Sequence, residues 1–97
     1  MKTHRFKTWT GKRRRYFVHI DDILYGRCEV PDKPGDRVRY NIDITTQQTR
    51  RQAIDCAIHE AIHAVDPDAS EDYVAHVSTE ATRFLWRFMK ARGMLKL

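Results

Sequence analysis

Two histidines four residues apart, His59 and His63, flank a glutamate at position 60 in a stretch with helical spacing. Residues four apart lie on one face of a helix, so both imidazoles can reach the same metal ion. Glu60 is rotated off that face, but it can still reach a water bound to the metal, as a general base must. The H-E-x-x-H spacing therefore predicts a zinc site with hydrolytic chemistry.

A catalytic zinc usually has three protein ligands and keeps one position open. The candidates for the third ligand are Cys56, Glu71, Asp72, His76 and Glu80. At 100° per residue, Asp72 points away from the apolar side of the second predicted helix and His76 lies well off it. Glu80 lies about 13 Å further along the axis than Glu71. The chain turns just after His63, so we expect Glu71 to be the ligand.

Three further residues keep two interpretations each. Cys56 shares the helix face of the histidines, so it is either a fourth ligand, which would close the site, or a small buried residue. Asp66 either ends the helix or orients a histidine through its carboxylate. His76 either stabilises an oxyanion or is an ordinary surface histidine. The motif itself could also arise by chance in a helix with two solvated histidines.

The first half of the chain is expected to be β-structure. Residues 16–20 alternate in polarity, residues 23–30 form a weaker candidate that contains Gly26, and residues 31–36 predict a turn. The clearest strand runs from Arg37 to Ile44, where apolar and polar side chains alternate. These strands predict a three-stranded, largely antiparallel sheet with one covered face.

The second half is expected to form two helices. Thr45 and Gln48 resemble a capping box, and the Asp66-Pro67 pair ends the first helix. Ser70 is the expected N-cap of the second helix, and Gly93 is its expected C-terminal cap. The expected buried stripe of the second helix is Val74, Val77, Ala81, Phe84, Leu85 and Phe88. A short connector predicts an antiparallel helical hairpin on the sheet, which makes the fold class α+β.

The chain has 97 residues, which is enough for one small domain spanning 1–97. No apolar run is long enough to span a membrane, and the basic N-terminus lacks the apolar core of a signal peptide. We therefore expect a cytoplasmic protein whose two cysteines are reduced. A metal ion would help to stabilise so small a domain.

The positive charge is concentrated at one end of the chain. The first fifteen residues carry seven cations and no acid, and removing those seven from the net charge of +5 leaves −2 for the rest. Such a segment can contact the phosphates of nucleic acids. It is also typical of a solvated arm, or of an edge strand whose charges repel neighbouring chains.

The segment from His59 to Asp72, together with residues 81–87, resembles the small zinc metallopeptidase-like proteins of the minigluzincin type, which are often found in phages. The resemblance covers about the last fifty residues well. It implies a zincin-like fold in which His59, His63 and Glu71 bind zinc and Glu60 is the general base. A phage-encoded chain would then act in the host cell cytoplasm. The metzincin pattern does not fit, because its glycine and third histidine positions hold Asp66 and Ala69.

Two functions follow from these expectations. The first is a zinc metallopeptidase that binds an extended peptide along the edge of the strand from Arg37 to Ile44. The second is a zinc-stabilised binding module with weak or no catalysis, whose basic N-terminal arm contacts nucleic acid or a protein partner.

Overall fold

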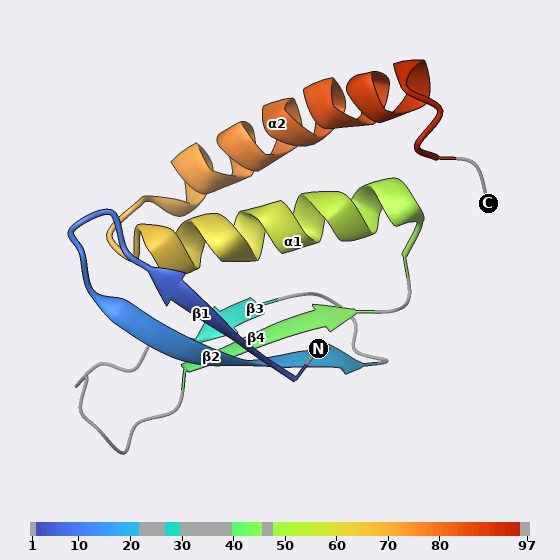
Figure 1. Ribbon diagram of the computed structural model, residues 1–97. Coiled ribbons are helices and arrows are strands. Elements are labelled where there is room, and N and C mark those ends of the chain that lie inside the picture. Colours follow the sequence, from blue (N-terminus) through green and yellow to red (C-terminus); the bar gives the residue numbers. More distant parts are fainter. Residues whose placement is uncertain (1, 22–26, 30–39, 46–47, 96–97) are drawn as a thin grey trace.

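A computed structural model describes residues 2–21, 27–29, 40–45 and 48–95 of the chain (Figure 1). Its elements, in chain order, are β1 (Thr3–Lys7), β2 (Arg13–Asp21), β3 (Arg27–Glu29), β4 (Tyr40–Thr45), α1 (Arg50–Val65) and α2 (Glu71–Ala91). The sheet forms one layer, α1 lies on it, and α2 lies on the far side of α1. The α+β class expected from the sequence is confirmed.

The sheet has four strands in the order β1-β2-β4-β3. β1 pairs antiparallel with β2, and β3 pairs antiparallel with β4, but the central pair β2 and β4 is parallel. The expectation of three strands was therefore wrong, and a largely antiparallel sheet is not confirmed, because the sheet is mixed. β4 lies between β2 and β3 and runs opposite to β3, so it has the same direction as β2, and β3 is left at the outer edge.

β4 occupies the centre of the sheet and not an edge. It pairs with β2 from Tyr40 to Thr45, and β3 covers its other side from Asn41 to Asp43. The expected peptide-binding edge along residues 37–44 is therefore wrong for residues 41–43, because their backbone groups already face two neighbouring strands. Residues 37–39, the turn at 31–36 and most of the 23–30 candidate lie outside the described residues.

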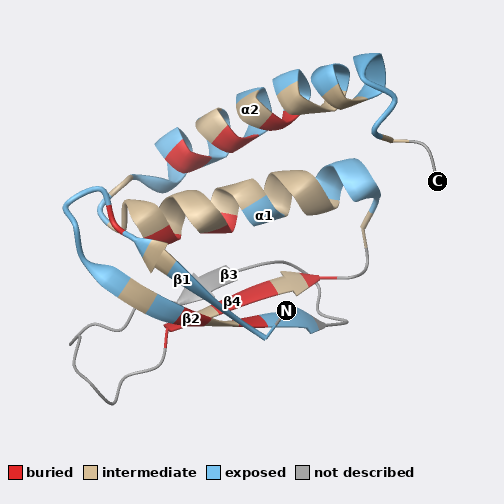
Figure 2. Cartoon of the chain, in the orientation of Figure 1, coloured by how far each residue is buried: buried red, intermediate tan, exposed pale blue. Residues whose placement is uncertain are grey.

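The core lies between the sheet and α1 (Figure 2). Tyr16, Tyr40 and Ile42 are buried on one face of the sheet, and they form a cluster with Ala64 of α1. The Tyr16 and Tyr40 ring centroids are 5.3 Å apart. The predicted alternation along β4 holds from Tyr40 to Ile42 but not beyond, because Asp43 and Thr45 are also buried and Ile44 is half-buried.

α1 begins later than the sequence suggested. Its N-cap is Thr49, whose side chain accepts a hydrogen bond from the Gln52 backbone, while the Gln52 side chain accepts one from the Thr49 backbone. The expected capping box at Thr45 was wrong because Thr45 is the last residue of β4. Gln48 instead donates through its side chain to the Thr45 carbonyl, 2.7 Å away.

α2 begins and ends where the sequence predicts. The Ser70 hydroxyl accepts a hydrogen bond from the Tyr73 backbone, and Gly93 has a φ of +69°, which suits a residue just beyond a helix C-terminus. The expected buried stripe is only partly correct. Val74 is buried, but Phe84 is 75% exposed and Phe88 is 48% exposed. Within the described part of the chain, neither helix is long and apolar enough to cross a membrane.

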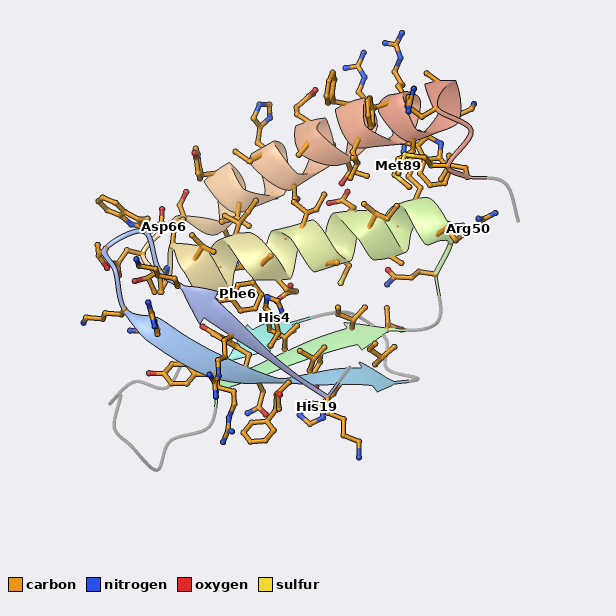
Figure 3. The ribbon with its side chains drawn as sticks, viewed as in Figure 1. His4, Phe6, His19, Arg50, Asp66 and Met89 are labelled. Atoms are coloured by element: carbon orange, nitrogen blue, oxygen red, sulfur yellow. The ribbon has the colours of Figure 1, made fainter. Side chains whose placement is uncertain are left out.

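The basic N-terminal segment is folded into a β-hairpin formed by β1 and the start of β2. Its turn is closed by hydrogen bonds between Thr8 and Lys12, and Gly11 has a φ of +99°. The turn contacts the end of α1, because the Trp9 backbone donates to the Val65 carbonyl and the Trp9 indole donates to Asp66 (Figure 3). The hairpin is thereby attached to the helix that carries both histidines of the motif.

Candidate metal centre

The centre is formed where α1 ends and α2 begins. His59 and His63 lie one turn apart on α1, with ring centroids 5.0 Å apart. Residues 66–70 reverse the chain, and Glu71 is the first residue of α2. Eight residues of sequence therefore separate His63 from Glu71, although their side chains touch.

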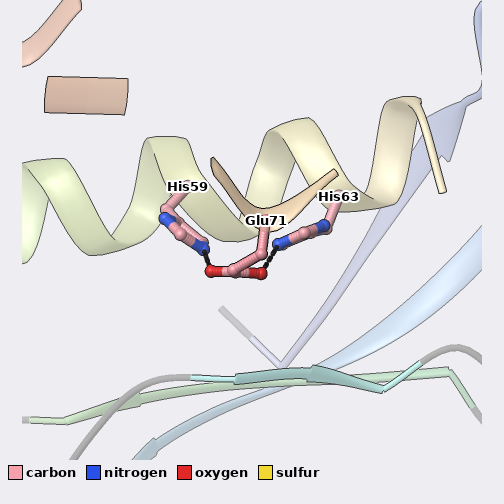
Figure 4. A group of neighbouring side chains, drawn as sticks. All are labelled: His59, His63 and Glu71. Atoms are coloured by element: carbon pink, nitrogen blue, oxygen red, sulfur yellow. Dashed lines mark hydrogen bonds and ion pairs between the residues drawn. The ribbon is translucent and has the colours of Figure 1, made fainter. Parts of the chain in front are cut away.

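The Glu71 carboxylate lies between the two imidazoles (Figure 4). One oxygen is 2.7 Å from His59 Nε2, and the other is 2.8 Å from His63 Nε2. The three ligand atoms lie within 4.8 Å of one another, which is a grouping that could hold a metal ion. Of the candidates for a third ligand, the structure brings Glu71 to the histidines.

Two nitrogens and one carboxylate oxygen match the donor set of many catalytic zinc sites. Ligand atoms about 2.1 Å from a tetrahedral ion lie about 3.4 Å apart, so an entering ion would require the Glu71 carboxylate to withdraw by roughly 0.6 to 0.7 Å. The Glu71 side chain is 70% exposed, whereas those of His59 and His63 are 20% and 19% exposed. The carboxylate is therefore the exposed side of the site, and the two rings are the more buried side.

Ser78 of α2 lies behind the His59 ring. Its side chain is 1% exposed, its hydroxyl donates to the Ala75 carbonyl at 3.1 Å, and its oxygen lies 3.5 Å from His59 Nδ1. A hydroxyl has one proton, so toward His59 the Ser78 oxygen can only accept. This contact favours a proton on Nδ1 of His59.

The Ser78 contact has a consequence for the opposite nitrogen. A neutral imidazole carries one N–H, so His59 cannot donate to Ser78 and to Glu71 together while it is neutral. With the proton on Nδ1, the lone pair of Nε2 points toward the Glu71 carboxylate. That arrangement is favourable when a cation lies between Nε2 and the carboxylate. Ser78 would then be the acceptor for the other ring nitrogen, as such acceptors are for many metal-bound histidines.

Glu60 is buried beside the centre. It is 4% exposed, and its Oε2 makes no hydrogen bond within the described part of the chain. Burial, together with the negative charges of Glu71 and Asp43, raises the pKa of the Glu60 carboxyl to about 7. Burying a carboxylate oxygen without a hydrogen-bond donor costs free energy of folding. Glu60 Oε2 is therefore a candidate for contact with a ligand or for proton transfer.

Glu71 has the opposite electrostatic environment. Desolvation acts to raise the pKa of its carboxyl, but the hydrogen bond from His63 and the charges of both histidines outweigh it and hold that pKa below its ordinary value. Glu60 and Glu71 are thus two nearby carboxyls whose pKa values are shifted apart. Such a separation is typical of sites where one carboxylate remains an anionic ligand and the other exchanges a proton.

The remaining predicted site residues lie elsewhere. Asp66 ends α1 and accepts the hydrogen bond from the Trp9 indole, while His76 is exposed on α2. Cys56 is not in the metal-ligand grouping; burial, with a contribution from Glu60, raises the pKa of its thiol, so it fits the interpretation of a packed residue. Glu80 is 3.6 Å from Arg83 and likewise outside the grouping.

Sequence reasoning missed Ser78, although a signal was present. Ser78 follows Glu71 by seven residues, which is two helical turns, so both lie on the same side of α2. From that position on α2, a polar side chain can reach the His59 ring that Glu71 also contacts.

No protein-family model, curated protein or solved structure matches this chain.

Replacing Glu71 with alanine removes one donor atom and leaves the two rings in place. We expect Glu71→Ala to weaken zinc binding by more than about a hundredfold, beyond the 10–100-fold typical of outer-shell changes. Glu80→Ala, an equal truncation two to three turns along the same helix, should leave affinity within about twofold. Competition with a chromophoric chelator measures both, and the reverse order of effects would show that Glu80 is the ligand.

Ser78→Ala removes the acceptor behind His59 while it adds no bulk. We expect zinc affinity to fall by about tenfold or more, with the His59 ring losing its preference for a proton on Nδ1. Chelator competition gives the affinity, and the ¹⁵N chemical shifts of the imidazole give the tautomer. Thr79→Ala, at the exposed neighbouring position, serves as the control. An unchanged tautomer in the Ser78→Ala variant would mean that the serine only fills space.

Proposed function

We propose that this chain is a zinc-dependent peptidase. One observation supports this function above others: the buried Glu60 carboxyl follows His59 directly in α1 and lies within electrostatic reach of Glu71, and so belongs with a preassembled group of two imidazoles and one carboxylate. Metal-holding donors alone would be compatible with a structural site. A general base needs a carboxylate that is close to the metal and not already bonded, and Glu60 Oε2 meets the second condition.

In the proposed site, His59, His63 and Glu71 would hold the ion. A zinc ion held there would supply a water of lowered pKa and a Lewis acid that polarises a carbonyl group. Ser78 keeps the His59 ring oriented through Nδ1. The structural alternative for Cys56 is not supported by the donor grouping, in which Cys56 has no part.

Glu60 is the proposed general base. Its pKa of about 7 in the metal-free environment lies near neutral pH, where a base both accepts a proton readily and returns it. The burial that raises this pKa also excludes water, which strengthens its interaction with any nearby polar group. The Glu60 carboxylate would take a proton from the water that attacks the peptide carbonyl. It would then pass that proton to the leaving amine.

The substrate would be an extended peptide, and we place it at β3. Among the described strands, β1 and β3 stand at the edges of the sheet, and both contact α1. Figure 4 shows the three side chains above the β3 and β4 side of the sheet. A peptide could therefore add to β3 by backbone pairing, with its scissile bond near Glu60. This location replaces the edge expected from the sequence at residues 37–44.

The resemblance to minigluzincins agrees with this assignment of roles and remains part of the proposal. So does the zincin-like character of the fold. An active helix followed by a helix that supplies the glutamate ligand is what that family has, and α1 and α2 stand in that order here.

The test is cleavage of a mixed peptide library by the zinc-loaded protein, read by mass spectrometry. We expect cleavage by the wild type and its loss in Glu60→Gln, which should keep about one zinc while losing at least about a hundredfold in rate. Glu80→Gln, the same change outside the site, should cleave normally. Equal rates for the Glu60→Gln variant and the wild type would remove Glu60 from the mechanism.

A second candidate function is nucleic-acid binding through the basic hairpin, as in a zinc-stabilised binding module. Arg5 lies directly opposite Arg15 in the β1–β2 ladder, and Lys7 lies opposite Arg13. All four are exposed, and no ion pair to them is present among the described residues. Like charges opposite each other destabilise a sheet, and a polyanion bound to this face would relieve that repulsion.

We expect the protein to bind a labelled DNA duplex with strong salt dependence. The double variant Arg5→Ala, Arg15→Ala should lower the slope of log K against log salt by about 2, one per phosphate contact. Lys90→Ala, Arg92→Ala removes the same charge from the far end of the molecule and should leave the slope unchanged. Binding that ignores salt would rule out this face as a phosphate-binding surface. Fluorescence anisotropy measures both.

A further inference from the structure

One side of α2 carries large side chains that the rest of the fold leaves uncovered. Tyr73 is 57% exposed, Phe84 is 75% exposed and Phe88 is 48% exposed. The side that packs on α1 is different, since it buries Val74, Ser78 and Thr82. Figure 3 shows side chains projecting from α2 away from α1. An exposed aromatic stripe of this kind is typical of an interaction surface.

The stripe follows a seam with the spacing of paired helices. The positions 73, 77, 80, 84, 87 and 91, which include Tyr73 and Phe84, recur at alternating intervals of four and three residues, which keeps them on one side of a helix. Four of the residues that line an open hollow on this surface are Glu80, Arg83, Phe84 and Arg87. Their spacing of i, i+3, i+4 and i+7 is that of the hole that receives a side chain from a facing helix.

The charges of α2 are segregated along its axis. Its N-terminal half carries Glu71, Asp72 and Glu80, while Arg83, Arg87 and Lys90 follow in the C-terminal half. A second α2 in the same direction would face this pattern with like charges. A second α2 in the opposite direction would place the acidic half of each helix beside the basic half of the other, and it would also oppose the two helix dipoles favourably.

We propose that α2 pairs with the α2 of a second copy of this chain, in antiparallel orientation about a two-fold axis near Phe84. Phe84 of each copy enters the hollow of the other. Glu80 then lies level with Arg87 of the second copy, because each is about three to four residues from the axis in opposite directions. A two-fold axis repeats this ion pair, so the interface contains it twice.

The position of the ion pairs agrees with the exposure of the neighbouring residues. At 100° per residue, Glu80 and Arg87 lie on the flank of the stripe that faces away from α1, while Phe88 lies on the flank toward α1. Phe88 is accordingly the less exposed of the two phenylalanines. The pairing thus has an apolar inner side and a charged outer rim, as protein interfaces generally do.

The separation of acidic and basic residues along α2 also argues against a nucleic acid on this surface. A polyanion along α2 would meet the carboxylates of Glu71, Asp72 and Glu80 as well as the cations. The α2 of a second copy offers opposite charges to both the acidic and the basic half of this helix. α2 is about 30 Å long, so a single helix pair buries a small area and should give a reversible dimer.

The test is sedimentation equilibrium over a range of protein concentrations. Glu80→Arg and Arg87→Glu should each raise the dissociation constant of the dimer by about tenfold, because each turns two attractions into two repulsions. The double variant Glu80→Arg, Arg87→Glu restores opposite charges across the axis, and we expect it to restore dimerisation. Phe84→Ser should weaken the dimer without changing helix content.

Lys90→Glu is the matched control, since it reverses a charge on α2 about 120° from the seam. It should leave the dissociation constant unchanged. A wild-type chain that remains monomeric at every concentration would overturn the proposal. A double variant as weak as either single one would overturn the antiparallel pairing of Glu80 with Arg87. Neither outcome bears on the proposed peptidase activity, because none of these residues belongs to the metal centre.

Discussion

The reversal of the chain between α1 and α2 is the constraint on which the candidate centre depends. Residues 66–70 bring the first residue of α2 beside the last turns of α1, so the Glu71 carboxylate can contact both His59 and His63. The hydrogen bonds of Trp9 to Val65 and Asp66 attach the β1–β2 turn to the same place. The helix end that positions His63 is therefore supported from the sheet as well as from α2.

Local features could be predicted from the sequence. The shared face of the two histidines, the end of α1 at Asp66, the cap at Ser70 and the closeness of Glu71 to the histidines all depend on helix geometry and on one short turn. The order of the strands could not be predicted, because it depends on pairings between distant segments. The start of α1 was misplaced because Thr45 and Thr49 each have a glutamine three residues later, and only the extent of β4 decides between them.

Burial was the other quantity that spacing did not determine. Phe84 and Phe88 follow the apolar periodicity of α2, yet α1 covers only one side of that helix and both remain exposed. Conversely, Ser78 and Glu60 are polar and buried. Ser78 donates to Ala75 of its own helix and faces His59 of α1, while Glu60 Oε2 has no hydrogen bond among the described residues. The residues that sequence reasoning assigned wrongly are thus those whose environment is set by packing between elements.

The buried cluster and the proposed ligands are separate sets of residues. Tyr16, Tyr40, Ile42 and Ala64 join the sheet to α1, and none of them belongs to the His59, His63 and Glu71 grouping. A cross-link between His63 and Glu71 would close a loop of only eight residues, so it would restrict the unfolded chain little. In a zinc finger the ion organises the hydrophobic core. Here it would enter a binding site that the folded core already supports. Uptake and release of the ion would then be exchange reactions of a folded protein.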